Sequence, residues 1–376
     1  MRSVGRYILG PLLAVGAAAL LAGCVSDGRV AAAKPVRTQQ PSAAPAHDFG
    51  DEAPIADGTP TGKVASEQLA SLEAPPNPDF QVWLGELRSE ALGKGIRKST
   101  LDAALGNLRP IPRVIELDRN QPEFKLTYRQ YLERVVPQSR IDKGRKMLAE
   151  NRKLLDPIAA KYGVPAQYLV AFWGVETDFG RVTGGFPVIP ALATLAHDGR
   201  RSSFFRRELL FALQIVDEGH VTPEKMVGSW AGAMGQCQFM PSSFVHYAVD
   251  ADGDGRKNLW TDKADVFASA ANYLREAGWQ AHESWGRPVT LPKKFDRRLG
   301  GSERRSFRTW AALGLKDASG KPLPRTDETA ALVIPDPDDA ATAFLVTDNY
   351  FTILKWNRST FYALAVGQLA DALAKR

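Results

Sequence analysis

The stretch from Pro165 to Gly180 constrains this chain most, because it predicts a short helix with an acid on an apolar face. Pro165 suits the first helical position and Gly180 suits the exit. Apolar side chains recur at three- and four-residue steps on the face that carries Glu176: Leu169, Phe172, Trp173 and Phe179. Apolar surroundings and the negative end of the helix dipole both disfavour a charged carboxylate. They raise the pKa of Glu176 and predict a general acid. The alternative is a Glu that reaches solvent past its neighbours or pairs with an arginine.

The N-terminus predicts export and lipidation. A positively charged start precedes an apolar run from Ile8 to Leu21, which is too short for a comfortable membrane span and typical of a signal peptide. The run ends in Leu21-Ala22-Gly23-Cys24, which resembles a bacterial lipobox. The resemblance implies a signal peptide at 1–23, a lipidated Cys24 and firm membrane anchoring by several acyl chains. The alternative is an ordinary secretory signal that contains a cysteine.

Residues 24–77 predict a flexible linker. They are rich in Ala, Pro, Gly and Asp, and Phe49 is their only aromatic residue. Such a composition buries too little surface to fold. About 50 flexible residues reach about 40 Å, so an anchored domain could search well beyond the membrane surface.

The net charge and the cysteine content exclude few classes of function. The formal net charge is +6, which suits nucleic acid, anionic lipid or an acidic polymer alike. Neither charge clustering nor a known module supports nucleic-acid binding. Cys237 has no disulfide partner once Cys24 is lipidated, so it is a reactive thiol or a small buried hydrophobe, and we expect the latter.

Two further motifs carry polar groups. Residues 228–243 set Ser229 and Gln238 among small residues that permit close backbone approach. Residues 250–261 place Asp at positions 1, 3 and 5 and Gly at position 6, as in the first half of an EF-hand calcium loop. Position 12 is Thr261, so a closing carboxylate must come from Asp262 or Asp265; an acidic turn open to water is the alternative.

The order of these motifs resembles the lytic murein transglycosylase B family, glycoside hydrolases with a lysozyme-like catalytic core. The resemblance covers about 78–373. Its carriers include Gly174-Val175-Glu176, an arginine pair at 200–201, Ala231-Gly232-Ala233-Met234-Gly235 and the Asp-rich loop. It implies a mainly α fold: a helical lobe at 78–160, a lysozyme-like core with an EF-hand-like loop at 161–286, a small β-containing lobe at 287–345 and C-terminal helices at 346–376.

The resemblance also implies the chemistry. Glu176 would protonate the glycosidic oxygen between N-acetylmuramic acid and N-acetylglucosamine, then deprotonate the muramoyl 6-hydroxyl to give a 1,6-anhydro product. Asp178, two residues on, points elsewhere on a helix and is not expected to assist. The implied groove residues are Tyr131, Arg200, Arg201, Ser229, Gln238, Tyr273, Asn357 and Tyr362. Trp356 stands where the family commonly has a tyrosine.

The implied cofactor is a structural calcium ion, held by Asp250, Asp252, Asp254, the Arg256 carbonyl and Asp265; no organic cofactor is expected. The implied partners are peptidoglycan glycan strands and a membrane reached through the lipid anchor, with other cell-wall enzymes as candidates. Val25, in place of an Asp that often retains lipoproteins at the inner membrane, favours the outer membrane, facing the periplasm. A lysozyme-type hydrolase and a catalytically silent peptidoglycan-binding scaffold are the alternative functions.

Overall fold

The computed structural model describes residues 78–120, 126–336, 339 and 342–375. The predicted signal peptide, Cys24 and linker lie outside these residues. The helices of the described part are α2 (Pro78–Gly93), α3 (Lys98–Leu105), α4 (Pro112–Arg119), α5 (Tyr128–Val135), α6 (Gln138–Glu150), α7 (Arg152–Tyr162), α8 (Ala166–Thr177), α9 (Val188–Asp198), α10 (Ser202–Asp217), α11 (Pro241–Tyr247), α12 (Lys263–Glu276), α13 (Phe307–Ala312), α14 (Asp348–Trp356) and α15 (Thr360–Ala374).

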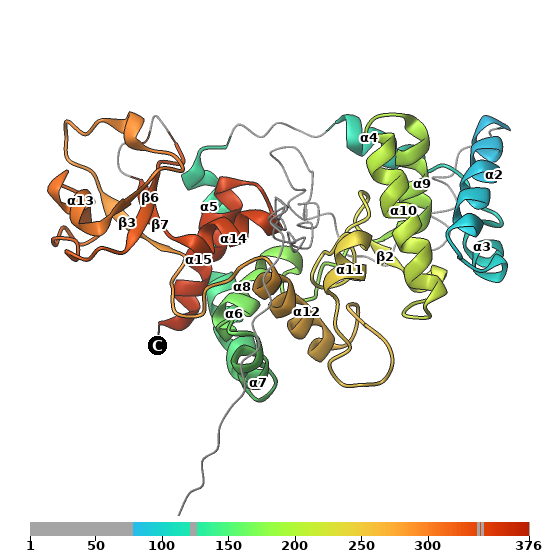
Figure 1. Cartoon of the computed structure of the whole chain (residues 1–376), viewed down its shortest axis with the longest axis horizontal. Coiled ribbons are helices and arrows are strands. Elements are labelled where there is room, and N and C mark those ends of the chain that lie inside the picture. The colour runs from blue at the N-terminus through green and yellow to red at the C-terminus, as the bar shows by residue number, and fades with distance from the viewer. Residues whose placement is uncertain (1–77, 121–125, 337–338, 340–341, 376) are drawn as a thin grey trace, which may run out of the picture. The chain divides into compact units, whose positions relative to one another are not determined.

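The strands are short and form two sheets. They are β1 (Phe186–Pro187), β2 (Val227–Gly228), β3 (Gly286–Thr290), β4 (Arg304–Ser306), β5 (Lys316–Asp317), β6 (Thr329–Val333) and β7 (Ala343–Val346). The expectation of a mainly α fold with a small β-containing part is therefore confirmed (Figure 1). None of the helices in the described part of the chain combines the length and apolarity that a membrane crossing requires.

Helix α8 runs through the main hydrophobic core and packs against α15, α6 and α7 (Figure 1). Every residue from Tyr168 to Gly174 is buried. The sequence predicted one apolar face, but the structure buries α8 on all sides, so the buried surface of this helix is wider than predicted. Packing explains why position 174 is a glycine. A Cβ there would lie 2.8 Å from the Phe179 ring, which folds back over the helix.

The ends of α8 differ from the prediction by a few residues. Pro165 adopts an extended backbone just before the first helical residue. The helix ends at Thr177, and Asp178, Phe179 and Gly180 all have positive φ. The Asp178 N–H bonds to Gly174 O and the Phe179 N–H bonds to Trp173 O, which is a Schellman-type ending.

The segment predicted as one helical lobe packs in two places. Helices α3 and α4 contact α10 and α9, whereas α6 and α7 contact α8. Residues 121–125 lie outside the described part, and α5 follows them. Thr127 and Gln130 form a capping box at its start, which explains why α5 begins there.

The five-stranded sheet has the order β4-β6-β7-β3-β5, with antiparallel pairs throughout. It encloses a small core of its own, which includes Phe307, Trp310 and Leu332. Strand β7 leads into α14, and Arg304 of β4 donates to Asp348 at the first residue of α14 over 2.8 Å. The sheet thereby fixes the start of the helix that carries Trp356.

Candidate active site

Glu176 lies near the end of α8 and contacts residues from α14 and α15. Trp356 Nε1, at the last residue of α14, donates to Glu176 Oε1 over 2.8 Å. The Tyr362 hydroxyl, in the first turn of α15, donates to the same oxygen over 2.5 Å. The Ser359 hydroxyl accepts from the Tyr362 N–H and caps α15, which sets the position of this tyrosine.

The second carboxyl oxygen, Oε2, is in a different situation. Oε2 has no hydrogen-bond partner among the described residues. It is also absent from the fully buried polar atoms of these residues that lack a partner, so it is not fully buried. The Glu176 side chain is half-buried, so Oε2 lies where solvent reaches it. One oxygen is tied to the protein and the other is open.

Burial sets the protonation of this acid. It raises the pKa of Glu176 to about 7, against the hydrogen bonds from Tyr362 and Trp356, which lower it. Both protonation states are then populated near neutral pH, as a group that gives and retakes a proton requires. Burial, with Glu176 second, also raises the pKa of Tyr362, so its hydroxyl stays a donor.

Asp178 is engaged elsewhere. Its carboxylate accepts from Arg181 Nε over 2.5 Å and from Lys143 Nζ over 3.1 Å. Although burial opposes them, these bonds lower the pKa of Asp178. They hold the left-handed residues at the end of α8, where backbone strain needs support. Asp178 therefore stabilises the end of α8. Its lowered pKa keeps it ionised near neutral pH, so it does not suit the role of a second acid.

Gln236, which the sequence analysis did not select, connects α8 to the end of the acidic loop. Its Oε1 accepts from Trp173 Nε1 over 2.8 Å, and its backbone carbonyl accepts from Thr177 Oγ1 over 3.1 Å. Its Nε2 donates to Trp260 O over 2.9 Å. A Cβ at Gly180, where φ is +78°, would lie 2.3 Å from Gln236 Oε1, so glycine is required there.

The inner side of the site is closed. A cavity of about 10 Å³ lies beside Glu176, with Cys237, Phe172 and Val266 in its lining. That is room for one water at most, so this cavity cannot admit a sugar. Cys237 is a free, buried cysteine whose Sγ lies 3.2 Å from Val266 O. Burial raises its pKa, and the interpretation as a small buried hydrophobe is confirmed.

Of the predicted groove residues, four gather around Glu176. Tyr362 binds it directly. Tyr131 packs with Val175, next to Glu176, and its ring lies 5.6 Å from the ring of Phe361, next to Tyr362. The Tyr273 ring lies 4.9 Å from the Trp356 ring. Asn357 follows Trp356, and its Oδ1 accepts from Ser359 N, which joins α14 to the cap of α15.

The arginine pair lies with Asp118 of α4. Arg201 Nη2 donates to Asp118 Oδ1 over 2.6 Å, and Arg200 Nη1 donates to the Asp118 carbonyl over 2.7 Å. Asp118 is only 1% exposed. Arg201 has a φ of +55°, and the ion pair supports this strained conformation at the start of α10. About half of the Arg200 side chain stays exposed.

Ser229 and Gln238 bond to nearby backbone groups. Ser229 Oγ accepts from Ala233 N over 3.0 Å. Gln238 Nε2 donates to Gly235 O over 2.8 Å and to Thr183 O over 3.2 Å, from a backbone with a φ of +49°. These bonds hold the loop of small residues that precedes α11.

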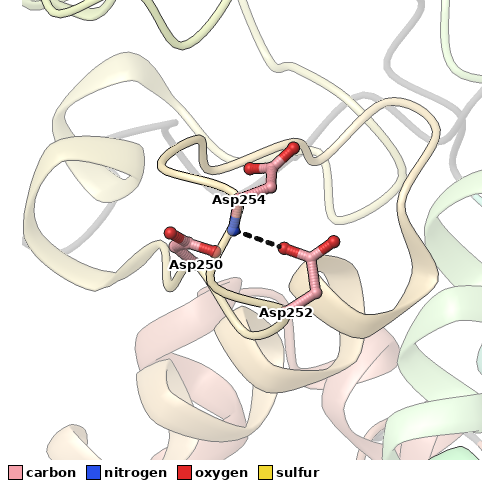
Figure 2. A group of neighbouring side chains, drawn as sticks. All are labelled: Asp250, Asp252 and Asp254. Carbon is pink, nitrogen blue, oxygen red and sulfur yellow. Dashed lines mark hydrogen bonds between the residues drawn. The ribbon is translucent and has the colours of Figure 1, made fainter.

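The acidic loop brings three carboxylates together. Carboxylate oxygens of Asp250, Asp252 and Asp254 all lie within 4.8 Å of one another (Figure 2). Figure 2 also shows the Asp254 N–H donating to Asp252 Oδ1. Although burial opposes them, N–H groups of Gly255 and Gly253 lower the pKa of Asp250. Calcium binds oxygens at about 2.3–2.6 Å, so oxygens about 5 Å apart fit opposite sides of one ion.

The two candidates for the closing ligand have other partners. Asp262 caps α12 by accepting from Ala264 N and Asp265 N. Asp265 is 1% exposed and accepts from Ala251 N over 2.7 Å and from Asn258 N over 2.6 Å. Asp265 thus ties the two sides of the loop together, outside the three-carboxylate cluster.

A comparison with known families decides what this acid site belongs to. The family of transglycosylase SLT domains matches residues 79–371. The chain belongs to this family. Its mainly helical fold is accordingly lysozyme-like, and the chain is a peptidoglycan lytic transglycosylase.

Relatives of the SLT-domain chain agree with this assignment. Membrane-bound lytic murein transglycosylase B of Escherichia coli (strain K12) is 31% identical over 313 residues, which are 79% of this chain and 83% of that protein. SltB3 of Pseudomonas aeruginosa, solved with NAG-anhNAM-pentapeptide, is 42% identical with a TM-score of 0.76, and the match covers 79% of this chain and 80% of that one. Escherichia coli Slt35, solved with calcium, is 30% identical with a TM-score of 0.68, covering 82% and 98%.

Two residues of this transglycosylase were missed or left undecided by sequence reasoning. Gln236 sits in a run of small residues beside Gln238, and nothing in the pattern distinguishes the two amides. Trp356 was noted only as a departure from the family. The indole–carboxyl contact joins residues 180 positions apart, and periodicity within one helix carries no signal for such a pair.

Proposed function

We propose that Glu176 alone performs both proton transfers of this lytic transglycosylase. The observation that carries the proposal is the asymmetric carboxyl group, with Oε1 bound to Trp356 and Tyr362 and Oε2 open, at a pKa of about 7. None of the interactions that shift this pKa comes from another carboxylate. Glycosidases that transfer to water ordinarily use two carboxylates, so a lone acid favours the non-hydrolytic route.

The proton balance closes on one residue. Neutral Glu176 protonates the oxygen of the N-acetylmuramic acid–N-acetylglucosamine bond, and the bond from C1 to this oxygen breaks. The resulting carboxylate removes the proton from the muramoyl 6-hydroxyl, whose oxygen bonds to C1. The product has a 1,6-anhydro end, and the enzyme regains its proton without consuming water.

The proposed substrate is the glycan strand of peptidoglycan. SltB3, 42% identical, was solved with a NAG-anhNAM-pentapeptide, which supports the same class of ligand here. Tyr131, Tyr273, Asn357 and Tyr362 are the proposed contacts near the acid, with Ser229 and Gln238 further along the strand. The half-exposed Arg200 and its neighbour Arg201 suit the carboxylates of a stem peptide.

A structural calcium ion is the proposed cofactor. The oxygens of Asp250, Asp252 and Asp254 have the spacing and chemistry for it, and calcium is present in the Slt35 complex. The Arg256 carbonyl is the proposed fourth ligand, with Asp265 as the candidate that closes the site. The ion would neutralise the repulsion among the three carboxylates and hold the loop.

The proposed location is the periplasmic face of the outer membrane, through a lipidated Cys24. The membrane-bound relative supports a membrane location. The proposed domain limits stay those predicted from the sequence, and other cell-wall enzymes stay candidate partners.

The test is product analysis. Full-length protein in detergent should release 1,6-anhydromuropeptides from murein, seen by mass spectrometry. Glu176→Gln should reduce the rate by about 10²–10⁴-fold, the usual scale of general acid–base catalysis. Glu150→Gln, an exposed acid at the end of α6, is the matched control and should retain full activity.

Three outcomes would contradict the proposal. Reducing ends in place of anhydro ends would indicate a lysozyme-type hydrolase. Binding to murein with no soluble product would indicate a scaffold. Full activity of Glu176→Gln would remove Glu176 from the mechanism.

A further inference from the structure

We propose that Trp356 is a positioning residue that keeps the reactive proton of Glu176 on Oε2. The inference rests on the proposed role of Glu176 as the acid and adds a residue of α14 to that site. It starts from the different hydrogen-bonding abilities of the two groups that contact Oε1.

An indole N–H can donate a hydrogen bond but cannot accept one, whereas a tyrosine hydroxyl can do both. If the proton of neutral Glu176 were on Oε1, the Tyr362 hydroxyl could turn and accept it. The Trp356 N–H, 2.8 Å away, could not, and it would then donate to the hydroxyl oxygen of the carboxyl group, which is a weaker acceptor than the carbonyl oxygen. Two donors on Oε1 therefore favour Oε1 as the carbonyl oxygen of the neutral acid, with the proton on Oε2.

The indole cannot turn away to relieve this constraint. Trp356 is 5% exposed. Its ring lies 4.6 Å from the Phe172 ring, 5.2 Å from Phe239 and 4.9 Å from Tyr273. Three rings from α8, the loop before α11, and α12 thus hold its orientation, and a buried side chain in such packing has one rotamer.

The consequence for the reaction is directional. Oε2 is the oxygen that solvent reaches, and the inner side of the site is closed by packing. A proton on Oε2 can be delivered outward to a bound sugar. A tyrosine at position 356 would allow the proton on either oxygen, and part of the enzyme would then hold it facing inward.

The other titratable groups close to Glu176 do not titrate in the pH range where the rate depends on Glu176. Tyr131 of α5, Cys237 of the loop before α11 and Tyr362 of α15 each interact with it, and burial raises the pKa of all three. Tyr273 of α12 packs on Trp356, and burial raises its pKa as well. Each stays neutral where Glu176 titrates, so the alkaline limb of the rate profile near pH 7 belongs to Glu176.

The experiment compares two replacements of Trp356 in the full-length protein, on soluble uncross-linked glycan strands. Trp356→Phe removes the N–H donor and shortens the ring. Benzothienylalanine at position 356 keeps the fused rings and removes only the N–H, so it tests the donor even where the Phe variant folds poorly. Trp279→Phe is the matched control: Trp279 is 7% exposed, and its buried Nε1 has no partner among the described residues.

Both replacements should move the alkaline limb of kcat/KM upward by about one pH unit, because a donor that stabilised the carboxylate is lost. They should lower kcat about tenfold, the scale of one lost hydrogen bond, with KM unchanged. Trp279→Phe should leave the limb in place.

Two results would overturn the inference: a limb that does not move, or a KM that rises while kcat holds, which would make Trp356 a sugar-binding ring. Absence of anhydro products from the unaltered protein would instead defeat the proposed function, so the two failures are distinguishable.

Discussion

The chain places carboxyl groups in two contrasting regions. Glu176 is a lone, half-buried acid at the end of α8, with a pKa raised to about 7. Asp250, Asp252 and Asp254 cluster in an exposed loop, where N–H groups overcome the effect of burial and lower the pKa of Asp250. The same chemical group serves as a proton donor in one place and as a cation ligand in the other. The surroundings, not the residue type, decide which.

The first prediction tests whether burial of the acid has a cost in stability. A raised pKa means that the native state holds the proton more tightly than the unfolded chain, so stability falls as pH rises from about 4.5 to about 7. Glu176→Gln should therefore be more stable than the unaltered protein by about 3 kcal/mol well above pH 7, and equally stable near pH 4. Denaturant unfolding at pH 4, 6 and 8 measures this.

Glu150→Gln, on the surface, should change stability by less than about 0.5 kcal/mol at each pH. A gain for Glu176→Gln that is the same at pH 4 and pH 8 would show that ionisation of this acid does not cost stability.

The second prediction separates Asp265 from the exposed cluster. Asp265 accepts backbone N–H groups from both sides of the loop, so it stabilises the fold without an ion. Asp265→Ala should lower the free energy of unfolding by about 2 kcal/mol in the presence of a chelator, because two donors lose their acceptor. Asp254→Ala, in the cluster, should cost less under the same conditions. If both variants lost the same free energy of unfolding, Asp265 would stabilise the loop no more than the exposed aspartates do.

The third prediction concerns the ion itself. Calcium at tenfold excess over its Kd should stabilise the native state by about 1.4 kcal/mol, measured as a rise in Tm. Asp250→Ala should abolish this rise, and Glu150→Ala should retain it. No rise with millimolar calcium in the unaltered protein would leave the loop as an acidic turn.

Several of the sequence-based predictions were made from local patterns and agree with the structure at that level. The helix expected after Pro165 is present as α8 (Ala166–Thr177), and the Asp-rich loop brings its carboxylates together because they alternate around Gly253. The exact helix end was misplaced. Phe179 folds back onto Gly174 in a left-handed conformation, and this depends on ion pairs from Asp178 to residues of other segments.

Contacts between residues far apart in the sequence could not be predicted from local patterns. The resemblance implies Arg200 and Arg201 as groove residues, but no local pattern predicts that they bind Asp118, which lies about 80 residues earlier. Gln236 links Trp173 to Trp260, and its amide has no distinguishing local pattern.

The sequence by itself determined that a carboxylic acid would lie on a helix among apolar residues and that three aspartates would share a loop, while the family resemblance implied a mainly helical chain. The first two follow from spacing along the chain, because helix and turn geometry convert spacing directly into proximity. Only the tertiary structure decided that Trp356 and Tyr362 would bind one oxygen of Glu176 and leave the other open. That choice depends on how α8, α14 and α15 pack, and packing is a property of the whole core rather than of any one segment.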